Sequence, residues 1–138
     1  ATAKVGDVVM LGRGGFGLFQ GFADVLNVRI QAPFNLRVER KIHEHGMKRL
    51  EGEALLHKFD QIRTSFISSD LNLNADDASM YDIVFNTELV KPDEAVSCIA
   101  SAYAELMANK RYGIGRNVSS IEVDPMLFKH VKGMLATV

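Results

Sequence analysis

A cluster of glycines around one arginine is the first feature of the sequence that could bind a ligand. It occupies residues 12–17, reads GRGGFG and follows a short apolar run. Glycines permit positive φ and a close approach of the backbone to a ligand, and successive N–H groups in such a turn can surround an anion. Arg13 adds a planar guanidinium that suits phosphate or carboxylate. The same residues also suit a tight turn that binds nothing, so both interpretations stay open.

This cluster is not a Walker A loop. That motif places Lys and then Ser or Thr after its second glycine, and no Lys-Ser or Lys-Thr pair occurs in the chain. We do not identify the cluster as a dinucleotide-binding fingerprint either.

A second candidate is the pair Asp60 and Arg63, which stand three residues apart in a helical pattern and therefore share one face. Arg63 could hold a phosphate while Asp60 orients it or accepts a sugar hydroxyl. The alternative is an exposed ion pair, which contributes little to stability or function.

Basic residues also gather around the turn that precedes this helix. A solvated helical face is the ordinary explanation, and a mobile basic lid that neutralises phosphate charge is the alternative. These residues are Arg37, Arg40, Lys41, Lys48 and Arg49.

Histidine and cysteine give no sign of catalysis or metal binding. None of the four histidines has a partner at metal-ligand spacing. The single cysteine, Cys98, excludes an internal disulfide and suits a small core side chain. We therefore predict no catalytic residue and no metal site in this chain.

The elements that must position these residues alternate between strand and helix. Apolar runs rich in β-branched residues predict strands, and apolar side chains at three- and four-residue spacing predict helices. The expected strands are 7–11, 25–31 and 81–86, and the expected helices are 34–46, 49–67, 92–109 and 126–135. This order predicts an α/β fold, a three-layer arrangement with a parallel sheet of about three strands flanked by helices. Ligands bind such sheets at the carboxyl ends of the strands.

Length and composition set the remaining limits. A chain of 138 residues has the length of one domain. We predict an α/β domain at 1–109 and a linker with a terminal helix at 110–138. A formal charge of −1 argues against nucleic acid as a partner. No apolar run approaches a membrane span and no secretory signal is present, so we expect a cytoplasmic protein without a membrane partner.

Five segments taken in order resemble the later part of a cytidylate-kinase-like protein, a branch of the nucleoside monophosphate kinases with the P-loop fold. They are VVMLGRGG at 8–15, VRIQAP at 28–33, RVER at 37–40, D-x-x-R at 60–63 and YDIVFNT at 81–87. The resemblance implies that Arg13 lines the acceptor pocket, that Asp60 lies near the sugar and that Arg63 binds the phosphate. It places Arg40 on the ATP side.

The resemblance also implies a substrate and a donor. The substrate would be a nucleoside monophosphate, with CMP as the candidate, phosphorylated by ATP with Mg²⁺ in an intact parent protein. True cytidylate kinases carry acidic residues on both sides of the Gly-Arg pair, where this chain has Leu11 and Gly14. This departure weakens the prediction of cytosine as the base.

In the family, the phosphate-binding loop would precede the position of Val5, and residues 1–138 do not contain this loop. Without that loop the fold is an incomplete P-loop kinase-like fold, and we expect no cofactor and no phosphoryl transfer from this chain as given. One hypothesis is the C-terminal portion of a nucleoside monophosphate kinase. The other is a non-catalytic module that senses nucleotides or serves structural interactions.

The sheet gives a further expectation. In the family fold a first strand separates the strands expected here at 7–11 and 25–31. Its absence would leave backbone groups unpaired, each at about 1–3 kcal/mol when buried. Either the two strands pair directly in another order, or a preceding segment or another chain supplies a strand. We expect a homo-oligomer in which a second copy donates it.

Overall fold

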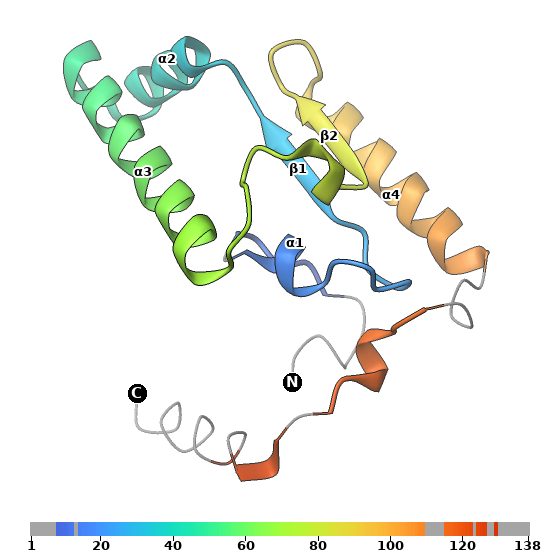
Figure 1. The fold of residues 1–138 in the computed structure, drawn as a ribbon. Coiled ribbons are helices and arrows are strands. Elements are labelled where there is room, and N and C mark those ends of the chain that lie inside the picture. Colours follow the sequence, from blue (N-terminus) through green and yellow to red (C-terminus); the bar gives the residue numbers. More distant parts are fainter. Residues whose placement is uncertain (1–7, 13, 110–114, 123, 127–128, 130–138) are drawn as a thin grey trace.

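The computed structural model of the chain describes residues 8–12, 14–109, 115–122, 124–126 and 129. These residues form a mixed α/β structure in which two parallel strands lie between helices (Figure 1). The helices are α1 (Gly15–Leu18), α2 (Phe34–His45), α3 (Arg49–Asp70) and α4 (Pro92–Ala108), and the strands are β1 (Val28–Gln31) and β2 (Ile83–Asn86). Two short 3₁₀ turns, Ala78–Met80 and Val118–Ser120, complete the elements.

The sheet is a single parallel pair, with Val28 opposite Ile83 and Gln31 opposite Asn86. The chain reaches β2 from β1 through α2 and α3, so both strands end on the same side of the structure (Figure 1). This crossover confirms the predicted alternation of strand and helix, and it brings the ends of the two strands together.

The prediction of about three strands is wrong for the described residues, which contain two. Residues 8–11 form no strand, and Val9 and Leu11 are 86% and 88% exposed. An apolar run becomes a strand only where another strand pairs with its N–H and C=O groups. No described strand lies beside residues 8–11, so the apolar pattern alone does not suffice. We expected a gap between a strand at 7–11 and a strand at 25–31. Because residues 8–11 are not a strand, the described structure has no such gap.

The helix boundaries follow local signals closely. Gly46 ends α2 with a φ of 64°, a left-handed conformation that favours glycine. The Glu51 carboxylate accepts the Lys48 N–H at 3.2 Å and caps α3, and Glu94 does the same for Lys91 at the start of α4. The expected helix at 126–135 lies largely outside the described residues.

Helices α2 and α3 form a hairpin whose interior is built around one residue. Val38 is fully buried, and Gly52 of α3 faces it. A Cβ at Gly52 would lie 3.6 Å from Val38 Cγ1, so the small residue lets the two helices approach closely. The hairpin thereby holds the side chains of α2 opposite those of α3.

Much apolar surface stays open around this small core. Among the described residues, Val9, Leu11, Leu50 and Leu89 are each at least 80% exposed. No described helix is long and apolar enough to cross a membrane. Residues 22–24 bind residues 116–118, with the Ala23 N–H donating to the Arg116 carbonyl at 2.8 Å. The domain boundary at residue 109 stays a prediction.

Candidate functional site

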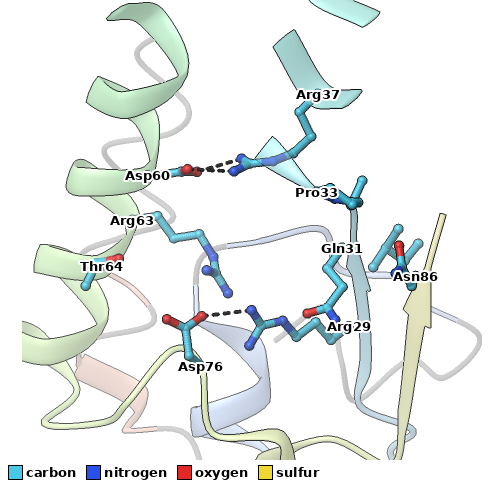
Figure 2. A pocket seen from close by; sticks show the side chains of 11 residues that line it. Arg29, Gln31, Pro33, Arg37, Asp60, Arg63, Thr64, Asp76 and Asn86 are labelled. Atoms are coloured by element: carbon cyan, nitrogen blue, oxygen red, sulfur yellow. Dashed lines mark hydrogen bonds and ion pairs between the residues drawn. The ribbon is translucent and has the colours of Figure 1, made fainter. Parts of the chain in front are cut away.

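A pocket of about 620 Å³ opens where β1 and β2 end, between the strands and the α2–α3 hairpin (Figure 2). This is the edge at which parallel sheets bind their ligands. Its lining residues are Arg29, Ile30, Gln31, Ala32, Pro33, Arg37, Asp60, Arg63, Thr64, Asp76 and Asn86.

Four segments bring the charged residues of the pocket together. Arg29 comes from β1, and Arg37 lies in the first turns of α2, which begins directly after the strand. Asp60 and Arg63 lie three residues apart on α3 and face the same way, as their spacing predicts. Asp76 comes from the loop between α3 and β2.

Arg37 and Asp60 form a two-pronged ion pair across the hairpin. Both guanidinium nitrogens of Arg37, Nη1 and Nη2, donate to the Asp60 carboxylate at 2.8 Å. The hydrogen bond from Arg37 lowers the pKa of Asp60, and the bond to Asp60 raises the pKa of Arg37. The carboxylate is therefore charged and oriented toward α2.

Arg29 and Asp76 form a second ion pair in the lining of the pocket. Arg29 donates to Asp76 at 2.8 Å and to the Ala75 carbonyl at 2.6 Å. The Arg29 side chain is only 16% exposed, and its guanidinium lies 5.7 Å from the centre of the Tyr81 ring. These contacts fix the guanidinium in one position.

Arg63 differs from these two arginines. Among the described residues it has no hydrogen-bond or ion-pair partner. Figure 2 shows its side chain extending from α3 into the space between the two pairs. The three arginines and two aspartates give the lining a formal charge of +1 (3 − 2). The arrangement can accept an anion, and a guanidinium can bind a phosphate through two parallel hydrogen bonds.

The structure brings two of the sequence-predicted site residues together and separates a third. Asp60 and Arg63 line one pocket, whereas Arg40 donates to the Thr87 hydroxyl at 2.9 Å and does not line it. Arg13 lies outside the described residues, so its convergence with Arg63 stays a prediction.

Sequence reasoning missed Arg29 and Asp76. The only signal for Arg29 was a charged residue within the short strand VRIQ. Nothing in the sequence singled out Asp76, and the described residues contain no group of three potential metal ligands. The sequence predicted a solvated face, or alternatively a basic lid, for Arg37, and the structure places it in the lining of the pocket.

The other basic residues of the supposed lid do not act as a group. Lys41 pairs with Glu44 at 2.7 Å, and Arg49 pairs with Glu39 and Glu53 on the surface. This pattern favours the solvated face for that part of the hairpin.

The glycine cluster carries the spacing G-x-G-x-x-G of a dinucleotide-binding loop. That motif requires a strand before it and a long helix after it, yet residues 8–11 form no strand and α1 has four residues. Gly14, at a φ of 69°, and Gly17 instead pack against the side chains of Leu71 and Leu73. The described part of the cluster favours the tight turn.

Cys98 is exposed, so its expected place in the core is wrong. Helix α4 is buried chiefly through Ala95, and Cys98 stands beside that stripe. Cys98 does not line the pocket described above.

The ion pair between Arg37 and Asp60 should stabilise the folded protein at neutral pH, and this contribution should be lost in acid. A group whose pKa is lowered on folding stabilises the protein above its unfolded pKa, about 3.9 for Asp, and loses that effect as the pH falls through the folded value. We expect the wild-type protein to lose its advantage over Asp60→Asn below about pH 4. The term is at most about 1 kcal/mol, because the two side chains are 32% and 44% exposed.

Urea unfolding at pH 7 and pH 3 measures this difference. Asp70→Asn is the matched control, since Asp70 makes no described hydrogen bond or ion pair. The same difference between wild type and Asp60→Asn at both pH values would contradict the assignment.

Comparisons with known proteins place these features in context. The family described as "Cytidylate kinase-like family" matches residues 1–89. A uronate isomerase of Corynebacterium glutamicum is 27% identical over 96 residues, which is 70% of this chain and 18% of that protein. The chain thus spans less than a fifth of the length of that curated relative. No solved structure matches the chain.

Proposed function

The chain belongs to the cytidylate kinase-like family, and from this premise we propose that its pocket binds the phosphate group of a nucleoside monophosphate. The observation that carries the proposal is Arg63, a cation that extends into the pocket and has no hydrogen-bond or ion-pair partner among the described residues. Two further arginines, Arg29 and Arg37, are held in place beside it. A phosphate monoester would bring the negative charge that this lining lacks.

CMP is the first monophosphate to test. Cytosine specificity rests on the family alone, and Leu11 and Gly14 depart from the acidic residues that true cytidylate kinases carry. Asp60, to which the resemblance gave the sugar, has its carboxylate bound by Arg37.

For an intact parent protein that also has a phosphate-binding loop, we propose that ATP phosphorylates the monophosphate bound in this pocket. Residues 1–138 contain no Gly-x-x-x-x-Gly-Lys-Ser/Thr motif, so the role proposed for these residues is to bind the acceptor. ATP, Mg²⁺ and the ATP-side role of Arg40 belong to that larger proposal. The likeness to uronate isomerase covers too little of that protein to support an isomerase proposal.

Calorimetric titration at low ionic strength tests the proposal. We expect CMP and inorganic phosphate to bind, and cytidine, which lacks the phosphate, to bind far more weakly. Low ionic strength is needed because salt screens the attraction between exposed charges. Binding of cytidine as tightly as CMP, or no binding of either phosphate compound, would contradict it.

We also propose that the chain forms a homo-oligomer through the free edge of β1. Within the described sheet β1 pairs only with β2, so one of its edges has no strand beside it. Residues 8–11 are an exposed apolar run that has strand-forming side chains and no strand partner in the described part of the chain.

Light scattering after size exclusion should then give twice the chain mass of 15.3 kDa. Val9→Lys should shift the protein toward monomer, because a charge in the donated strand resists burial. Leu89→Lys is the matched control, since Leu89 is 88% exposed and lies outside both segments. A monomeric wild type, or a dimer that Val9→Lys leaves intact, would refute the arrangement.

A further inference from the structure

The two aspartates of the pocket offer different chemistry. Both nitrogens of the Arg37 fork bind the two oxygens of Asp60, one to each. Asp76 gives only Oδ1 to Arg29, and its Oδ2 accepts no hydrogen bond from the described residues. The Asp76 side chain is 71% exposed at the pocket wall, whereas Arg29 behind it is 16% exposed. A carboxylate oxygen that is open to the pocket can accept a hydrogen bond from a ligand.

The loop holds Asp76 in this position. Ala75 is 3% exposed and anchors the segment, and its carbonyl accepts a hydrogen bond from Arg29. The Asp76 N–H donates to the Asn74 side chain at 2.9 Å. Backbone, carboxylate and guanidinium are thus tied to one another, so the free oxygen is already oriented before a ligand arrives.

A phosphate on Arg63 cannot be the partner of that oxygen, because two anions repel each other. The partner must be a neutral donor close to the phosphate. In a nucleoside monophosphate the sugar follows the phosphate directly, and its hydroxyls are neutral donors. Asp76 and Arg63 line the same pocket, and Figure 2 shows Arg63 directed toward the Arg29–Asp76 pair.

We propose that Asp76, rather than Asp60, accepts a hydrogen bond from a sugar hydroxyl of the bound monophosphate and determines the preference for a hydroxylated sugar. This inference rests on the proposed function, because it needs the phosphate on Arg63. It adds a specificity-determining residue in the loop between α3 and β2.

The experiment compares CMP with 2′,3′-dideoxycytidine monophosphate, which keeps the base and the phosphate and lacks both hydroxyls. The wild-type protein should prefer CMP by about tenfold or more, the effect of a hydrogen bond to a charged group. In Asp76→Asn the preference should fall to within about twofold. Inorganic phosphate should bind that variant no more weakly than it binds wild type, since a negative charge has been removed.

Controls separate the possible outcomes. Asp70→Asn makes the same change in charge outside the pocket and should keep the preference. Loss of the preference in Asp60→Asn but not in Asp76→Asn would overturn the inference. Equal weakening of both ligands by Asp76→Asn would also overturn it, because the hydroxyls would then not be what Asp76 recognises.

The outcome also distinguishes this inference from the proposed function. If CMP and phosphate bind wild type and the preference survives in Asp76→Asn, only the inference about Asp76 fails. If neither CMP nor phosphate binds wild type, the proposed function fails and the inference fails with it.

Discussion

Replacing Arg63 with alanine is expected to weaken the binding of CMP and of inorganic phosphate by about 10- to 100-fold. A hydrogen bond to a charged group is worth about 1.5–3 kcal/mol, and each 1.4 kcal/mol is a factor of ten in affinity. Arg63→Ala should reduce the affinity more than alanine at Arg29 or Arg37 would, because Arg29 and Arg37 already bind Asp76 and Asp60. Isothermal titration of wild type and variant at the same low salt measures the loss.

Two further variants make this result specific. Arg63→Lys keeps the charge but removes the two-pronged fork, so its affinity should lie between wild type and alanine. Arg49→Ala removes an arginine from the same helix outside the pocket, where it pairs with Glu39 and Glu53. Arg49→Ala should therefore bind like wild type. Equal affinities of wild type and Arg63→Ala would exclude Arg63 as the phosphate ligand.

Placing a carboxylate at Val38 is expected to have the largest effect on folding. Val38 is fully buried between α2 and α3, and no described cation faces it. An unpaired charge in such a place costs about 3–5 kcal/mol, against a total stability of about 5–15 kcal/mol for a typical domain. Val38→Asp should therefore lose most of its cooperative urea transition, followed by circular dichroism at 222 nm.

The same helix supplies the control. His43 is exposed on α2, so His43→Asp introduces the same side chain at the surface and should cost no more than about 1 kcal/mol. Val38→Ala should lie between them, at about 2 kcal/mol, because it removes buried methyl groups without adding charge. A Val38→Asp protein as stable as His43→Asp would mean that the hairpin interior is open to water.

The hairpin links these two predictions. Arg37 stands on α2 one position before Val38, and its partner Asp60 lies on α3. Loss of the Val38 contact should release both charged residues and the pocket wall that Arg63 shares. We therefore expect Val38→Asp to weaken CMP binding as well, whereas Arg63→Ala should leave the urea transition in place.

The helices and one face of the site could be read from the sequence. The bounds of α2, α3 and α4 follow from apolar spacing, from Gly46 and from the glutamates at 51 and 94. These signals act between residues at most four positions apart, so no tertiary contact is needed to interpret them. The same local rule put Asp60 and Arg63 on one face of α3, and the ordered motifs indicated the family that the comparison then showed.

Only the tertiary structure shows which residues form ion pairs with one another and which strands pair. Asp60 binds Arg37, 23 positions away, and Arg29 binds Asp76, 47 positions away. Residues 8–11 have a strand-forming sequence but no described strand beside them, whereas Val28–Gln31 has β2. A strand and an ion pair each need a second group from elsewhere in the chain, and helical periodicity carries no information about that group. This is why Arg63 was visible in the sequence as a candidate ligand, whereas only the fold shows that it has no hydrogen-bond or ion-pair partner among the described residues.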